Sequence, residues 1–158
     1  MKRKALAITL AAAMAMGTCA VTASAADGDK YTIGICQLVQ HEALDAATQG
    51  FKDEVTKELG EDAVTFDEQN AQGDSNTCST IINSFVSNNV DLILANATPA
   101  LQAAAAGTSD IPILGTSVTE YGVALGLDDF DGTVGGNISG TADLAPLCLL
   151  YTSPSPRD

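Results

Sequence analysis

The chain has 158 residues, 46% of them hydrophobic, and its 20 acidic residues outnumber seven basic ones, which gives a formal net charge of −13. Such acidity excludes nucleic acid and anionic lipid as partners, because both would repel the surface. The length is enough for one domain with a core of its own.

The chain begins with the three parts of an export signal. Residues 2–4 are basic, residues 5–17 form an apolar run, and Ala23-Ser24-Ala25 provides a small-x-small cleavage site. The run is shorter than the roughly 20 residues of a membrane-spanning helix. We therefore predict that residues 1–25 are a signal peptide and that the mature chain is exported to the periplasm or the extracellular face of the cell membrane.

Cys19 leaves a second interpretation of this signal open. It follows Met16-Gly17-Thr18, and a lipid on this cysteine would tether the protein to the outer face of the membrane. Thr18 is a poor residue in front of a lipidated cysteine, so soluble export is the preferred prediction.

After the signal, the hydrophobic pattern predicts a strand, a helix and a second strand. Residues 31–39 are predicted to form a strand and residues 42–59 a helix, which ends at Gly60. The helix places five apolar residues on one face: Leu44, Ala47, Phe51, Val55 and Leu59. Residues 63–67 are predicted to form the next strand.

A second helix follows, with Ser75 as its predicted N-cap. Its apolar residues recur at helical spacing: Cys78, Ile81, Ile82, Phe85 and Val86. Residues 90–95 form a continuous apolar run, which is typical of a strand covered on both faces of a parallel sheet. Thr98 and Pro99 are then predicted as the N-cap and first residue of an alanine-rich helix that ends at Gly107.

Residues 111–115 are predicted to form a fourth strand and residues 137–142 a fifth. Repeated strand-helix units with right-handed crossovers predict an α/β fold with a doubly wound, mostly parallel sheet of flavodoxin-like order. In such sheets ligands bind at the carboxyl ends of the strands. This rule selects four turns, whose mostly neutral hydrogen-bonding groups suit a zwitterion or another polar solute: residues 37–41, 69–76, 96–98 and 116–119.

Patterns for catalysis and for metal binding are weak. His41 is the only histidine, and no Gly-x-Ser-x-Gly motif accompanies it, so no catalytic residue is assigned and an exported enzyme is disfavoured. No Cys/His spacing suggests a metal, and no cofactor is expected. Cys36 falls in a predicted strand and Cys78 in a predicted helix, so two buried thiols are predicted and not a disulfide.

Residues 148–158 share neither the acidity nor the periodicity of the preceding chain. Back-translated, they give a nucleotide string that resembles the transposase adapter of tagmentation sequencing libraries. We interpret them as read-through into an adapter, with the natural gene continuing past Leu147; a genuine Ser/Pro-rich tail is the alternative. Cys148 is set aside with this segment.

Five motifs occur in an order that resembles a known family. They are QLVQHEALD (37–45), DEQNAQGDSN (67–76), NATP (96–99), GTSVT (115–119) and GGNISGTAD (135–143). Together they are similar to a family of ABC-transporter substrate-binding proteins that includes the tryptophan/tyrosine-type binding proteins. The resemblance covers residues 31–147.

The resemblance implies a two-lobed periplasmic-binding-protein fold of type I, in which a hinge closes both lobes over one solute for delivery to a membrane permease. Residues 26–147 resemble the N-terminal lobe and the first crossover, and the second lobe is expected to be absent from this chain. The resemblance implies that the hinge residues are Gly140, Thr141, Ala142 and Asp143. A monomer is expected, and a lone lobe is expected to bind solute weakly or not at all.

The resemblance also implies which residues contact the solute, and these come from three turns: Gln37, His41, Glu42, Asn96, Ala97, Thr98, Thr116, Ser117 and Thr119. The sequence departs from the family pattern at Glu42, where proline is usual, and at Thr119-Glu120-Tyr121, where Thr-Asp-Pro is frequent. An extra carboxylate at the mouth would disfavour an anionic ligand group unless it meets the ligand amine. An aromatic or other hydrophobic amino acid is the expected solute.

Two alternatives stay open. His41 and Thr98 are expected first as residues that start helices, and the hydroxyl of Thr98 is expected to be used in that cap. The whole protein is predicted to serve an importer, but a sensing module that presents its solute to a membrane receptor would expose the same surfaces on closure.

Overall fold

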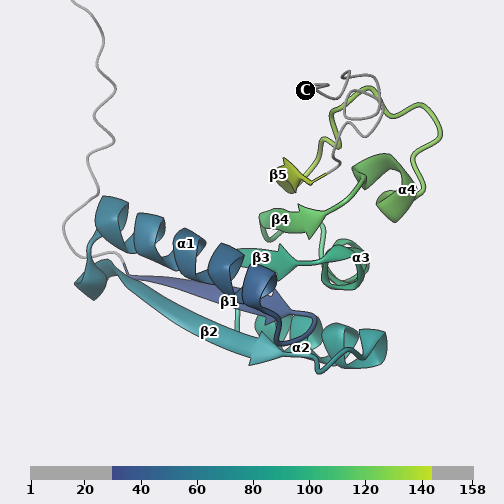
Figure 1. Ribbon diagram of the computed structural model, residues 1–158. Helices are drawn as coiled ribbons and strands as arrows, with labels where there is room; N and C mark the ends of the chain where they lie inside the picture. Colours follow the sequence, from purple (N-terminus) through teal and green to yellow (C-terminus); the bar gives the residue numbers. More distant parts are fainter. Residues whose placement is uncertain (1–29, 144–158) are drawn as a thin grey trace, which may run out of the picture.

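The computed structural model describes residues 30–143, which form a single parallel sheet flanked by helices (Figure 1). The predicted signal peptide, Cys19 and residues 148–158 lie outside the described residues. In chain order the elements are β1 (Tyr31–Gln37), α1 (Glu42–Leu59), the 3-10 helix η1 (Glu61–Ala63), β2 (Val64–Asn70), α2 (Ser75–Ser87), β3 (Leu92–Asn96), α3 (Thr98–Gly107), β4 (Ile113–Val118), α4 (Tyr121–Leu125) and β5 (Ile138–Ala142). No helix among residues 30–143 is long and apolar enough to cross a membrane.

The strands follow the order β2-β1-β3-β4-β5, and every neighbouring pair is parallel. This confirms the predicted α/β class and the flavodoxin-like order. Parallel strands need crossovers, and α1, α2 and α3 supply them on the two faces of the sheet. All carboxyl ends of the strands therefore lie at one edge.

The ends of several elements differ from the prediction. β1 ends at Gln37 and not at residue 39, whereas β2 and β3 continue to Asn70 and Asn96. The reason is the register of the strands, which pairs Gln37 with Asn70 on one side and with Asn96 on the other. The hydrogen bonding between strands therefore continues through polar residues that follow the apolar runs. The short helix α4 was not predicted at all.

The cap predicted for α2 is wrong by one residue. The side chain of Asp74 accepts a hydrogen bond from the N–H of Asn76 at 2.7 Å, so Asp74 is the N-cap and Ser75 is the first residue of the helix. Both residue types cap helices well, and the sequence by itself did not separate them.

Two hydrophobic clusters cover the two faces of the sheet. On one face α1 packs over Ile33, Ile35 and Leu94, and on the other α2, α3 and α4 enclose a larger cluster that includes Phe85 and Leu101. The alternation of side chains along β1 and β3 explains this division, because successive residues point to opposite faces. The predicted continuous apolar strand is confirmed, since the central strand β3 is buried on both sides.

Gly34 permits a close approach between β1 and α2. A Cβ atom at this position would lie 2.7 Å from the Cδ2 and Cγ atoms of Phe85, which is fully buried. Gly50, in the middle of α1, has no heavy atom within 4 Å of its Cβ position. The two glycines therefore differ in what an added methyl group would meet.

We expect Gly34→Ala to lower the free energy of unfolding by about 1–3 kcal/mol, because the methyl group must displace a packed ring. Gly50→Ala is the matched control and should raise the free energy of unfolding by about 0.5–1 kcal/mol through helix propensity. Urea unfolding curves of both variants measure the difference. Equal effects of the two substitutions would contradict the packing of Phe85 against β1.

Candidate functional site

The predicted site turns meet at the carboxyl edge of the sheet, which we call the rim. Backbone hydrogen bonds extend the strand pairing into these turns: the N–H of Leu38 donates to Asn96 O at 3.2 Å, and the N–H of Ala97 donates to Thr116 O at 3.0 Å. The N–H of Ala71 donates to Gln37 O at 2.8 Å and brings in the turn after β2. The four turns are thus held together by their backbones.

A buried polar network lies directly below the rim. The hydroxyl of Thr48 donates to Gln37 Oε1 at 2.7 Å and accepts from Asn96 Nδ2 at 2.9 Å. All three side chains are buried, with Asn96 at 0% exposure. Asn96 Nδ2 also donates to Leu44 O at 2.8 Å, and Gln37 Nε2 donates to Asp45 Oδ1 at 2.6 Å.

This network joins the first turns of α1 to the ends of β1 and β3. The amide groups of Gln37 and Asn96 are engaged inside the fold, so they position the rim from below. One atom is the exception, because Asn96 Oδ1 is buried without a hydrogen-bond partner among the described residues. Leaving a buried acceptor unpaired costs about 1–3 kcal/mol.

The helices that start at the rim differ in how their N-termini are capped. His41 Nδ1 accepts from Ala43 N at 3.2 Å in α1. In α4, both carboxylate oxygens of Glu120 accept backbone N–H groups at 2.7 Å. With Asp74 in α2, three of the four α-helices have a side-chain cap.

The N-terminus of α3 has no side-chain cap. Its N-cap residue is Ala97, and Thr98 and Pro99 are the first residues of the helix. The prediction of Thr98 as N-cap is therefore wrong, and its hydroxyl is not consumed by capping. Within residues 30–143, no side chain accepts a capping hydrogen bond from the first turn of α3, so its backbone dipole is uncompensated at the rim.

Backbone strain concentrates at the same edge. Among the described residues, four other than glycine have positive φ, and three of them follow or end strands at the rim: Gln72 (53°), Ala97 (93°) and Ser117 (55°). Ala97, with ψ 158°, occupies a region that is essentially restricted to glycine and costs on the order of 1–3 kcal/mol. Ser117 lies where the β4–β5 register shifts between Gly115 and Val118, and such an irregularity redirects a side chain.

The other predicted contact residues are accessible. His41, Glu42 and Thr119 are exposed, and Thr98, Thr116 and Ser117 are half-buried. Glu42 is the first residue of α1, where its carboxylate complements the helix dipole. The carboxylate of Glu120 is used in the cap of α4.

A hollow of about 340 Å³ adjoins Thr119 at the ends of β4 and β5. Tyr121, Phe130 and Ala142 give it a largely apolar wall. Burial raises the pKa of the Tyr121 phenol, so its hydroxyl stays protonated and donates to Thr141 O at 3.4 Å. The sequence did not single out this aromatic pair.

Three of the four predicted hinge residues lie in the last strand, β5. Gly140, Thr141 and Ala142 belong to β5, and the N–H of Asp143 donates to Val118 O at 2.9 Å. A Cβ atom at Gly140 would collide with the Tyr121 hydroxyl and the backbone of Gly115. The segment is therefore closely packed against β4.

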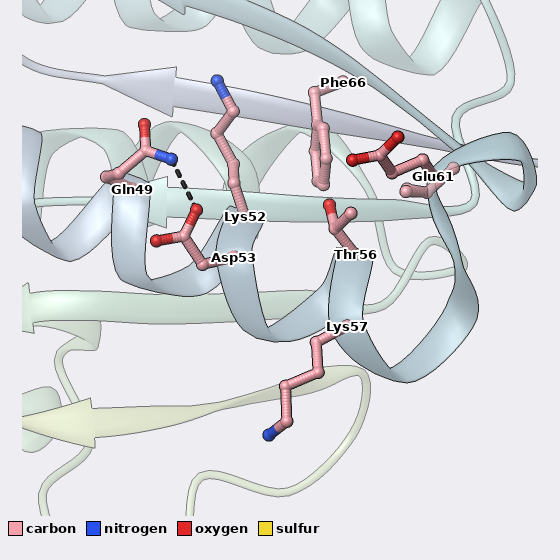
Figure 2. Close-up of a pocket in the computed structure, with 8 residues that line it drawn as sticks. Gln49, Lys52, Asp53, Thr56, Lys57, Glu61 and Phe66 are labelled. Atoms are coloured by element: carbon pink, nitrogen blue, oxygen red, sulfur yellow. Dashed lines mark hydrogen bonds between the residues drawn. The ribbon is translucent and has the colours of Figure 1, made fainter.

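A second, separate groove of about 560 Å³ lies between α1 and the start of β2, away from the rim (Figure 2). One of its two lysines, Lys52, pairs with Glu68 at 2.9 Å and lies 5.7 Å from the centre of the Phe66 ring, and the other, Lys57, pairs with Glu54 at 2.7 Å. Gln49 Nε2 donates to Asp53 Oδ1 at 2.6 Å on the same wall. These groups satisfy one another, so we assign no ligand to this groove.

Sequence reasoning missed Thr48, the only fully buried residue of α1. The signal was present, because Leu44, Thr48, Phe51 and Val55 follow helical spacing and place a threonine within the apolar face. A polar side chain in such a position indicates a buried hydrogen-bond partner.

Residues 32–148 match the family of ABC transporter substrate binding proteins. The chain belongs to this family, whose members bind solutes and are generally extracytoplasmic. Over 115 residues it is 46% identical to the tyrosine-binding protein of Clostridioides difficile (strain R20291), an alignment that covers 70% of this chain and 32% of that protein.

Two solved structures share this fold over part of their length. One is the ligand-free, open structure of a Clostridium difficile substrate binding protein with adhesive properties, with 44% identity, a TM-score of 0.67, and coverage of 73% of this chain and 39% of that one. The other is an ABC domain from Streptococcus pneumoniae in complex with L-Trp, with 31% identity, a TM-score of 0.65, and coverage of 72% and 39%. The chain thus spans between 32% and 39% of the length of these relatives.

We expect Thr48→Val to lower the free energy of unfolding by about 1–3 kcal/mol, because it removes a donor to Gln37 and an acceptor for Asn96 while keeping the shape of the side chain. Thr56→Val, on the same helix, is the control and should change it by less than about 0.5 kcal/mol. Thermal and urea unfolding give both values. If both variants lose the same stability, the network does not hold α1 on the sheet.

Proposed function

We propose that the protein is the extracytoplasmic solute-binding component of an ABC importer and that the rim holds the polar part of a small solute. The observation that carries the proposal is the start of α3, where an uncapped first turn follows the strained Ala97 at the end of β3, the strand between β1 and β4. Free backbone N–H groups at a helix N-terminus favour an anionic group such as a carboxylate.

One helix terminus is worth only about 0.3–1 kcal/mol to an anion, so further groups must contribute. The hydroxyls of Thr98, Thr116, Ser117 and Thr119 are the candidates on the neighbouring turns. Gln37, Asn96 and Ala97 act from below by fixing the positions of these turns.

The two remaining candidates lie at the start of α1. His41 uses Nδ1 for the helix cap, which leaves Nε2 for a solute. Glu42 is exposed and negative, so it favours a solute amine over a solute carboxylate. A zwitterion would match both groups, because its carboxylate would lie at the N-terminus of α3 and its amine would lie near the carboxylate of Glu42.

An aromatic amino acid is the proposed solute. One named relative is a tyrosine-binding protein and another holds L-Trp, and the chain is 46% and 31% identical to these two. Tyr121 and Phe130, beside Thr119, provide an aromatic wall near the rim. Solute side chains of this class bury large apolar areas, which adds affinity that the polar rim cannot supply.

In the proposed whole protein, a second lobe closes over the rim and Gly140 to Asp143 lead into the hinge. The chain spans between 32% and 39% of the length of its named relatives, which leaves room for such a lobe. Residues 1–25 serve as the export signal in this proposal, residues 148–158 are not native, and the loaded monomer delivers its solute to a membrane permease.

A thermal-shift screen of the whole protein against the common amino acids tests the solute class. Tyrosine, tryptophan or phenylalanine should raise the Tm, since a solute bound only by the folded state stabilises it. Thr98→Val should weaken binding of that amino acid about 10- to 150-fold by removing one hydrogen bond to a charged group. Thr80→Val, on α2, is the control and should leave binding unchanged.

The lone lobe gives a second test. Residues 26–147 should bind the same amino acid at least about 100-fold more weakly than the whole protein, because a lobe without its partner supplies only part of the contacts and cannot exclude water. Isothermal titration measures both affinities. Tight binding by the lobe would show that the rim is a complete site and would contradict the two-lobed proposal.

A further inference from the structure

Two buried cysteines lie on β1 and α2, which pack against each other. Cys36 is the residue before the last of β1, and Cys78 lies in the first turns of α2; both are free thiols with 0% exposure. Both belong to the same hydrophobic cluster. Each thiol perturbs the pKa of the other, so the two side chains are neighbours within this cluster.

The surrounding structure fixes this arrangement. The side chain of Cys36 lies on the face of β1 that packs on α2, opposite to Ile35 and Gln37. The turn before α2 is tied to the end of β1, because the N–H of Gly73 donates to Leu38 O at 2.7 Å. The N–H of Cys78 donates to Asp74 O at 3.1 Å, which sets the first turn of the helix. These backbone contacts therefore hold the start of α2 against the end of β1, the two segments that carry the cysteines.

We propose that Cys36 and Cys78 form a disulfide when the protein meets a low-molecular-weight disulfide, and that this bond locks the turn after β2 onto the end of β1. The family's generally extracytoplasmic setting is where such oxidants persist. The sequence favoured two buried thiols, and the structure shows the reduced state of this pair.

The reaction consists of two thiol-disulfide exchanges. One protein thiolate attacks the small disulfide, forms a mixed disulfide and releases one small thiol. The second protein thiolate then attacks the sulfur of the first, forms the Cys36–Cys78 bond and releases the second small thiol. The two protein sulfurs are oxidised, the small disulfide is reduced, and the two thiol protons leave with its two halves.

Burial controls the rate of this reaction. Burial raises the pKa of both thiols, and the neighbouring Cys78 raises that of Cys36 further, so both stay protonated in the closed structure. The exchange therefore requires a transient opening of the first turn of α2. Once formed, the bond joins segments about 40 residues apart and restricts the unfolded chain, which stabilises the fold.

Peptide mapping of the full chain tests the proposal. The reduced protein is incubated with oxidised glutathione at neutral pH, free thiols are blocked with N-ethylmaleimide, and the chain is cut with trypsin and Glu-C. These proteases place Cys36 in residues 31–42 and Cys78 in residues 69–120, each without another cysteine. We expect a linked pair of these peptides by mass spectrometry and a rise in Tm of at least about 5 °C that dithiothreitol reverses.

Cys78→Ala is the control and should give neither the linked peptides nor the rise in Tm, whereas replacing Cys19 and Cys148 with serine should leave both intact. The wild-type map decides the matter even if Cys78→Ala fails to fold. Only unlinked peptides after prolonged incubation, including incubation in dilute urea to promote opening, would overturn the proposal. A linked pair that lowers the Tm would overturn it too, since the bond would then strain the native structure.

Discussion

The candidate site depends on one constraint, which is that all five strands run in the same direction. Parallel pairing puts Gln37 of β1 beside Asn96 of β3, and Asn96 beside Thr116 of β4. Polar residues that are far apart in the sequence therefore meet at one edge. Backbone hydrogen bonds at Leu38 and Ala97 carry the same register into the turns, so the geometry of the site follows from the pairing of the strands.

The buried network beneath the rim matters more for geometry than for stability. A hydrogen bond in a protein contributes a net of about 1 kcal/mol, while a buried polar group without a partner costs more than that. Thr48, Gln37 and Asn96 satisfy one another only in this register, so any other placement of α1 would leave several polar groups unpaired. The network thereby favours a single position for the start of α1, where His41 and Glu42 lie.

The sequence predicted the fold class because apolar periodicity depends on which faces are buried, and every strand and long helix carries that pattern. It placed His41 at the start of α1, where this residue caps the helix, but it assigned the N-caps of α2 and α3 to the wrong residues. Asp74 and Ser75 are both good caps, and the bond from Gly73 to Leu38 is part of what sets the turn that precedes α2. Nothing in an alanine side chain favours the positive φ of Ala97. That conformation is held by two backbone hydrogen bonds, from the N–H of Ala97 to Thr116 O and from the N–H of Leu101 to Ala97 O.

The start of α3 shows how the fold and the proposed function are coupled. Side-chain caps contribute about 1 kcal/mol to a helix, and α3 has none and begins at a strained residue. The chain therefore forgoes stability at the helix terminus that follows the central strand β3. An anionic group bound there would accept the hydrogen bonds that a cap would otherwise accept. In this proposal, the bound solute also serves as the N-terminal cap of α3. Occupancy of the rim should therefore order the turn from Ala97 through the first residues of the helix.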